Sequence, residues 1–469
     1  MFDILINNCC AVTMDPQRRI FPRCAIAIKD GVISAIGDHI SGQAVKVIDG
    51  ANCYALPGLV NCHTHVYQAL LEGIGYDMHF NPWNIRFLIP LISRMGLEHA
   101  RASAEIAALE MIKSGTTAFS DHWYLHTDFE NIEEVAAGFD RAGIRNHSVF
   151  GFLNESFAGR KKEHSEADVL KGDDELLGKA EDYVKRWQGR NLTTTALGPG
   201  STEDVSQGLF RKIIELAGRL DVSVVTHISG WVEIVSRSLE KYRLRDLEYA
   251  HSLGFTGKKS IAIHGVWLSE EEIRIVAETG TKVVHNPVAN MHLGYGIAPV
   301  TEMLARGVNV GLGTDGAASY TYDMFEIGKT AAMLQKARKM DAEALTAEKA
   351  LEMMTIDGAR ALGLEQSIGS LEQGKSADII LIDTDVPHIM AGGRPIPKIV
   401  YSTKGSDVIT SIIHGRLVME DRKVLSLDET RVMENAENMK KDLFRKAGEH
   451  TAALIEAPWP EKKASWRMV

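Results

Sequence analysis

Residues 56–65 read LPGLVNCHTH, an apolar extended run that closes in two histidines, His63 and His65. Side chains at positions i and i+2 of a strand point to the same face, so both imidazoles can reach one metal ion. Taken alone, the pair is a weak signal, because two ordinary surface or core histidines are more common than a metal site. The rest of the chain must decide between these two interpretations.

Three more strand-like apolar runs end in a side chain that can bind a metal. They are Val222–His227, Ser260–His264 and Val308–Asp315. Polar residues placed repeatedly at the carboxyl ends of strands are typical of the catalytic face of a parallel α/β barrel. The strand ends therefore favour a metal site built from several βα units.

Segments with helical periodicity alternate with these strands. The clearest are Leu97–Lys113, Gln207–Leu220, Glu270–Glu278 and Asp323–Lys339. The alternation is consistent with about eight βα units. It predicts an α/β protein whose catalytic domain, residues 56–365, is a (β/α)8 TIM barrel.

Short β-rich runs occupy both ends of the chain, before about Asn52 and again from Ala377. Turn signals such as Lys29-Asp30-Gly31 separate them. Each block is too small to bury its own faces, so we expect residues 1–55 and 366–428 to form one small composite β-sandwich. Residues 429–469 are expected to form a C-terminal helix and an irregular tail.

The composition excludes several classes of function. The chain has 469 residues, a formal net charge of -10 and a pI near 6.0, which argues against binding of nucleic acid through phosphate contacts. No apolar run approaches the roughly 18 residues of a membrane span, and the first residues lack signal-peptide features. We expect a cytoplasmic protein without a membrane partner. The five cysteines lie in the first 62 residues without Cys-x-x-Cys spacing, which predicts reduced thiols.

Several motifs, in order, resemble those of the amidohydrolase superfamily, in the branch of the S-adenosylhomocysteine and methylthioadenosine deaminases and the triazine hydrolases. Besides the His63–His65 run they are Ser114–Thr117, His285–Pro287, Gly296–Val300, Gly311–Ser319 and Gly374–Asp378. The resemblance covers nearly the whole chain. It is specific for the family and much less specific for the substrate.

The resemblance implies a mononuclear metal centre. His63, His65, His227 and Asp315 would be the ligands, and Asp315 and His264 the catalytic residues. This set suits one Zn²⁺ per chain, with Fe²⁺ possible. The third and fourth strand runs contain no lysine that could form a bridging carbamate, which favours one metal over two. A bound ion would make hydroxide available near neutral pH. Asp315 would accept the proton of the attacking water, and His264 would hydrogen-bond the tetrahedral centre or pass a proton to the leaving group.

Candidate substrate contacts lie around the mouth of the predicted barrel. They are Asn81, Trp83, His122, Trp231, His264 and His285. Tryptophans can stack on a flat heterocycle, although aromatic residues fill ordinary cores just as often. Loop histidines are about as common in packing roles as in binding.

Three positions depart from the pattern of the deaminases that the chain resembles. Gly230 stands where they carry a glutamate that passes protons to the departing ammonia, and Glu233, three residues further on, is more simply a charge on the next helix. Asn81 lies in a segment where adenosine-type deaminases carry an acid nearby that contacts ribose hydroxyls. Gly200 replaces a common fourth-strand histidine. These departures weaken the prediction of a nucleoside substrate.

Three hypotheses for function follow. The leading one is a metal-dependent hydrolase acting on a C–N bond of a nucleobase-like heterocycle, most simply a deaminase. The second is a triazine-type hydrolase that displaces chloride or an alkylamine. The third is a catalytically impaired metal-binding relative, which Gly230 favours and the presence of His264 and Asp315 opposes. We expect a small heterocyclic substrate and a homo-oligomer.

Overall fold

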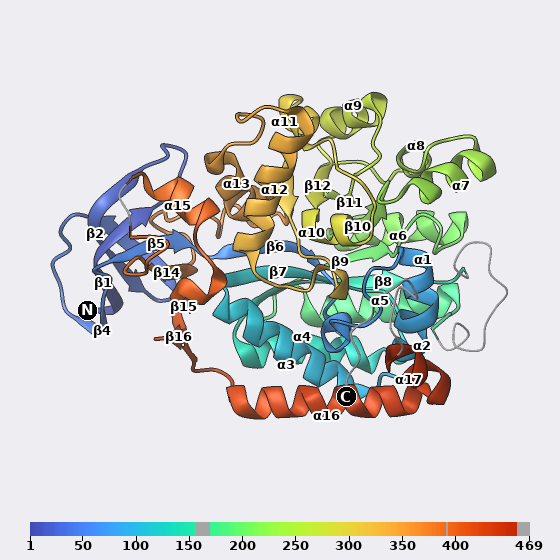
Figure 1. Cartoon of the computed structure of the whole chain (residues 1–469), viewed down its shortest axis with the longest axis horizontal. Helices are drawn as coiled ribbons and strands as arrows, with labels where there is room; N and C mark the ends of the chain where they lie inside the picture. Colours follow the sequence, from blue (N-terminus) through green and yellow to red (C-terminus); the bar gives the residue numbers. More distant parts are fainter. Residues whose placement is uncertain (156–168, 391–392, 457–469) are drawn as a thin grey trace, which may run out of the picture.

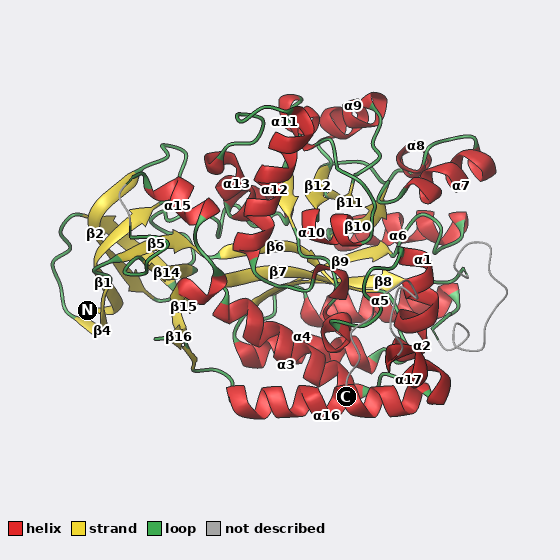
Figure 2. Ribbon diagram, viewed as in Figure 1, coloured by secondary structure: helices red, strands yellow, loops and turns green. Residues whose placement is uncertain are grey.

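The computed structural model describes residues 1–155, 169–390 and 393–456. A barrel of parallel strands surrounded by helices forms the larger part, and a separate sheet built from both chain ends lies beside it (Figures 1 and 2). This arrangement confirms the predicted fold class. The exact domain boundaries proposed from the sequence stay a prediction.

The barrel sheet contains eight parallel strands whose spatial order follows the sequence. They are β6 (Leu59–Thr64), β7 (Thr116–Trp123), β8 (Arg145–Phe152), β9 (Thr193–Pro199), β10 (Ser223–Ile228), β11 (Ser260–His264), β12 (Lys282–His285) and β13 (Val310–Leu312). A parallel bridge between Thr64 and Asp315 brings the last strand back to the first. The Asp315 N–H donates to the His63 carbonyl at 2.9 Å, so the closure itself joins two residues of the predicted site.

Helices cover the outside of the barrel (Figure 2). They are α1 (Phe80–Trp83), α2 (Ile89–Ile92), α3 (Leu97–Lys113), α4 (Glu130–Ala142), α5 (Asp173–Trp187), α6 (Gln207–Leu220), α7 (Val232–Tyr242), α8 (Asp246–Ser252), α9 (Glu270–Thr279), α10 (Pro287–His292), α11 (Val300–Ala305), α12 (Met324–Lys339), α13 (Ala347–Met354) and α14 (Ile356–Ala361). The bounds predicted for α3 and α6 are confirmed. Ser206 caps α6 by accepting a hydrogen bond from the Leu209 N–H, which fixes where that helix begins.

The second sheet joins strands from both ends of the chain in one hydrogen-bonded network. Its strands are β1 (Phe2–Val12), β2 (Ile20–Lys29), β3 (Val32–Gly37), β4 (Ala44–Asp49), β5 (Cys53–Pro57), β14 (Ile379–Asp383), β15 (Val408–Ile413), β16 (Arg416–Glu420) and β17 (Lys423–Val424). β5 pairs with β14 and thereby joins the two blocks. All five cysteines are free thiols.

The opening stretch Leu56–His65 is divided between the two sheets, where the sequence predicted one continuous extended run. β5 ends at Pro57 and β6 begins at Leu59. A β-carbon at Gly58 would lie 2.0 Å from the Thr117 hydroxyl oxygen, so only glycine fits this crossing point. The absent side chain lets the chain pass from one sheet to the other in a single residue.

The C-terminal segment forms α16 (Glu429–Ala447), which lies along α3, and α17 (Glu449–Glu456); α15 (Pro395–Tyr401) lies between β14 and β15 in the sequence. Lys113 on α3 pairs with Glu429 at 2.8 Å, which ties the start of α16 to the barrel. The predicted irregular tail after residue 456 lies outside the described residues. Within the part of the chain that is described, no helix is long and apolar enough to cross a membrane.

Candidate metal centre and active site

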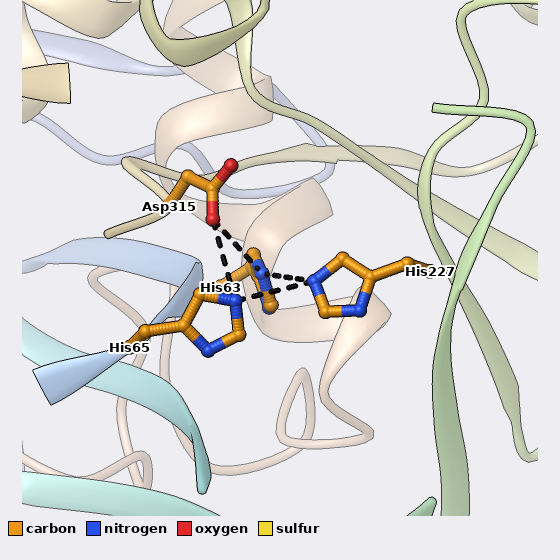
Figure 3. A group of neighbouring side chains, drawn as sticks. All are labelled: His63, His65, His227 and Asp315. Carbon is orange, nitrogen blue, oxygen red and sulfur yellow. Dashed lines mark hydrogen bonds and ion pairs between the residues drawn. The ribbon is translucent and has the colours of Figure 1, made fainter. Parts of the chain in front are cut away.

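Four buried side chains converge at the carboxyl ends of the barrel strands. His63 lies in β6, His65 directly after it, His227 in β10 and Asp315 just beyond β13. One ligand atom from each lies within 4.8 Å of the others, and Figure 3 shows the four side chains pointing toward one another. The structure thus brings together all four residues predicted as metal ligands.

The spacing of the ligand atoms fits a tetrahedral cation. The Nε2 atom of His227 lies 3.2 Å from Nε2 of both His63 and His65. Oδ1 of Asp315 lies 3.4 Å from those same two histidine atoms. Zinc–ligand distances of about 2.0–2.1 Å place tetrahedral ligands roughly 3.3–3.4 Å apart. The four atoms therefore have the separation of ligands around one such ion.

Hydrogen bonds behind His65 and His227 fix the tautomer of their neutral imidazoles. His65 Nδ1 lies 2.7 Å from the carbonyl oxygen of His122, and His227 Nδ1 contacts the carbonyl of Gly200. Each carbonyl accepts only from a protonated Nδ1, so in the neutral imidazoles both Nε2 atoms carry lone pairs that face each other. Two facing lone pairs repel unless a cation lies between them, which makes a metal the simplest occupant.

Burial also favours the neutral form of the histidines. Desolvation, followed by the fields of neighbouring histidines, holds the pKa of His63 well below its ordinary value. Desolvation lowers the pKa of His227 to about 4. Neutral imidazoles are the form that binds metals, so the environment and the predicted role agree.

Two residues of the site are held in the left-handed backbone region. His264 has a φ of 76° and Asp315 a φ of 68°, which costs about 1–3 kcal/mol for a residue other than glycine. Hydrogen bonds hold Asp315 in place: its carbonyl accepts from the Thr64 hydroxyl at 2.9 Å. Strain of this kind, held by surrounding bonds, is common at functional sites.

His264 lies beside the four ligands without joining them. Its Nε2 is 3.8 Å from Oδ2 of Asp315, and its ring stacks on His227 at a centroid distance of 5.3 Å. Nδ1 lies 2.9 Å from Oδ1 of Asn290. With the proton on Nδ1, the lone pair of Nε2 faces the centre and can accept a proton. Burial lowers the pKa of His264.

A pocket opens above this centre and has two chemically different walls. Phe80, Trp231 and Tyr295 form an aromatic wall, with ring centroids 5.1–6.2 Å apart. The indole N–H of Trp231 has no hydrogen-bond partner among the described residues. This wall suits a planar ring and offers it one donor.

The other wall is polar and is formed by the loop after β9 and by one residue of α7. Ser201, Glu203, Asp204 and Arg237 line it. Glu203 and Arg237 form a bidentate ion pair with both N···O distances at 2.7 Å. Asp204 is buried, and desolvation raises the pKa of its carboxyl to about 7. Sequence reasoning noted Gly200 in this segment and missed the acidic pair that follows it.

The predicted substrate contacts divide into two groups. Asn81, Trp83, Trp231 and His264 line the pocket. His122 and His285 are fully buried and do not line it. His122 instead stacks on His227 at 5.5 Å with nearly parallel rings, behind the metal ligands. The pocket lining therefore gives no support to a substrate contact by His122 or His285. Tyr124 and Tyr295, which sequence reasoning did not single out as contacts, do line the pocket.

Glu233 and Ser229, the residues considered as replacements for the absent shuttle glutamate, lie in different surroundings. Glu233 lies at the start of α7 and is exposed. It does not line the pocket itself but lines an outer cavity that shares Phe80 and Trp231 with it. The Ser229 hydroxyl donates to Asp246 at 2.6 Å and is fully buried, so it does not hold a water in the pocket. A β-carbon at Gly230 would lie 2.9 Å from the His264 ring. A glutamate at this position, as in the deaminases whose motifs the chain resembles, thus has no room while His264 stays in place.

We predict that Gly230→Glu lowers the turnover number instead of restoring a shuttle, because the new side chain must displace His264. A misplacement of about 1 Å in a catalytic group can cost up to about 100-fold in rate. Steady-state kinetics at equal metal content measures the effect, and Gly230→Ala serves as the smaller matched change. A faster Gly230→Glu enzyme would contradict the packing argument.

Comparison with known protein families gives a match over most of the chain. Residues 54–418 match the model of a family described as the amidohydrolase family. A 5'-deoxyadenosine deaminase of Methanosarcina acetivorans is 35% identical over 453 residues, covering 95% of this chain and 100% of the relative. A 5-methylthioadenosine/S-adenosylhomocysteine deaminase of Syntrophobacter fumaroxidans is 36% identical and covers 92% and 96%.

Solved structures give a similar result. An adenosine deaminase from Xanthomonas campestris with bound zinc superposes with a TM-score of 0.88 at 28% identity, covering 94% of this chain and 98% of that one. The zinc complex of an atrazine chlorohydrolase from Arthrobacter aurescens has a TM-score of 0.86 at 23% identity and covers 93% and 100%. At 23% identity, the similarity to the atrazine chlorohydrolase shows a shared fold and no more.

Proposed function

We propose that this chain, which belongs to the amidohydrolase family, is a metal-dependent aminohydrolase that replaces an amino group of a nucleobase-like heterocycle by oxygen and releases ammonia. The observation that carries the proposal is the convergence of three imidazoles and one carboxylate beside His264, beneath a pocket with an aromatic wall. Its relatives with 35–36% identity over nearly their whole length are named deaminases.

The donor set fits zinc, with Fe²⁺ as an alternative for the same ligands. A divalent ion held there would bring the pKa of a coordinated water toward roughly 7. Asp315 can accept a proton from the attacking water, because it lines the pocket and its Oδ2 lies 3.8 Å from Nε2 of His264. His264 can pass a proton to the departing nitrogen.

We predict close to one tightly held divalent ion per chain. The four converging side chains provide a single site, and β8 and β9 contain no lysine for a bridging carbamate. Elemental analysis of the purified protein measures the ratio. Two ions per chain that survive extensive dialysis would contradict the mononuclear assignment.

The cytoplasmic location and the homo-oligomeric state stay predictions.

Gly230 favours one second candidate. Ammonia leaves poorly unless it is protonated, whereas chloride leaves as an anion and needs no proton donor. A hydrolase that displaces chloride from a triazine would therefore not need a glutamate at position 230 as a proton donor. Alkylamine displacement would need the same proton as deamination.

The test is a substrate screen with metal-loaded and chelator-treated protein. Aminopurines, aminopyrimidines, pterins and amino- or chlorotriazines are incubated with each sample, and ammonia and chloride are measured. Ammonia release that depends on the metal supports the aminohydrolase proposal, and chloride release alone supports the second candidate. Release of neither ammonia nor chloride from any of these compounds would contradict both candidate functions.

A further inference from the structure

We propose that Asp204 selects the substrate by accepting hydrogen bonds from N–H groups on the edge of the heterocycle opposite the carbon under attack. The inference rests on the proposed function and adds the substrate class: a planar, amino-substituted ring with N–H donors on its far edge. It concerns a residue that sequence reasoning did not identify. Four observations support it.

The first is the space that Asp204 occupies. A β-carbon at Gly200 would lie 2.4 Å from Oδ2 of Asp204 and 2.9 Å from the ring of Tyr124. No other residue fits at position 200 unless the carboxyl moves. The glycine and the aspartate therefore form one arrangement, in which the carboxyl fills the space where a side chain at the end of β9 would lie.

The second is burial within the pocket. Asp204 lines the pocket although its exposed fraction is only 6%. Ser201 donates a hydrogen bond to the carboxyl, and desolvation keeps its pKa near 7. Burying a carboxyl group costs free energy unless its oxygens accept hydrogen bonds. A ligand that supplies N–H groups is therefore favoured over an apolar ligand.

The third is its distance from the reacting atoms. Asp204 lies against Gly200, and the Gly200 carbonyl contacts Nδ1 of His227, the nitrogen that points away from the metal ligands. The His227 ring therefore lies between the Gly200 carbonyl and the other metal ligands. Asp204 is not among the converging ligand groups, so we assign it to the ring of the substrate and not to the leaving nitrogen.

The fourth is the charge of the neighbouring groups. Arg237 is engaged by Glu203 through two hydrogen bonds of 2.7 Å, so the nearest cation already has a carboxylate partner. Asn81, the other polar candidate, is more exposed than Asp204 and lies toward the mouth. We therefore assign Asp204 to N–H donors of the ring and take a ribose hydroxyl as the competing assignment.

The experiment compares melamine with an aminodimethyltriazine that keeps one amino group for attack and carries methyl groups of similar size in place of the other two. We expect wild-type protein to have a higher kcat/KM for melamine than for the dimethyl compound, mainly because of a lower KM. In Asp204→Asn, kcat/KM should fall about 10- to 100-fold for melamine and stay unchanged for the dimethyl compound. Activity of the variant on the dimethyl compound confirms that it folds. Glu240→Gln, at an exposed position of α7 outside the pocket lining, is the matched control and should change kcat/KM on either compound less than tenfold.

Calorimetric binding of both compounds to metal-loaded protein gives a readout independent of turnover. Equal losses on both compounds, or no loss of melamine preference in Asp204→Asn, would overturn the inference. A preference of wild-type protein for adenosine over dideoxyadenosine that disappears in Asp204→Asn would overturn it in favour of a ribose contact. If no compound is hydrolysed but melamine still binds in an Asp204-dependent way, the inference stands and the proposed deaminase activity fails.

Discussion

His227→Ala is expected to lose both the metal and the activity. His227 supplies the Nε2 atom that lies 3.2 Å from two other ligand nitrogens, so its removal opens one corner of the tetrahedron. Even the partners that orient a metal ligand are worth about 10–100-fold in metal affinity. We therefore expect at least about a 100-fold weaker affinity, measured by titration with a competing chelator, and activity that tracks the bound metal.

His292→Ala provides the control, because His292 is a solvent-exposed histidine on α10 whose ring lies 4.9 Å from Tyr320. It should keep the metal and the activity. A His227→Ala protein with full metal content would show that this side chain is not a ligand. Partial return of activity at high zinc concentration would instead fit the weakened site.

The fold was predictable because its signals are local. The apolar periodicity of α3 and α6, together with polar residues at strand ends, predicted the barrel and two helices at their observed bounds. The parallel strands of a barrel bring their carboxyl ends to one face, so any strand-end residue is a candidate for the site. That rule brings the strand-end residues to one face, and the resemblance to the amidohydrolase motifs selected the four that converge in the structure.

The walls of the pocket were less predictable, because they depend on which loop folds over the centre. His122 ends the same kind of strand as His63, yet it stacks behind His227, while Tyr124 two residues later reaches the pocket. Asp204 lies in a loop with no periodicity. The one available signal was Gly200, since a glycine at a strand end suggests that another group occupies the space of its side chain.

His264→Ala is expected to keep the metal and lose most of the activity, the opposite pattern to a ligand. His264 is 3.8 Å from Asp315 and stacks on His227, but it lies outside the group of four converging ligand atoms. Loss of a general acid–base group usually costs about 10²–10⁴ in rate, so kcat should fall by that factor at unchanged metal content.

The comparison with Asn290→Ala separates chemistry from positioning. Asn290 lies 2.9 Å from Nδ1 of His264 and does not line the pocket. Its removal should leave the imidazole present but less well oriented, so we expect a smaller loss in kcat than for His264→Ala. If His264→Ala loses its metal as completely as His227→Ala, then His264 acts as a ligand and the proton must be passed by another group. Asp315 would then be the nearest remaining residue able to move it, because both of its carboxylate oxygens already lie within 3.8 Å of histidine nitrogens in this centre.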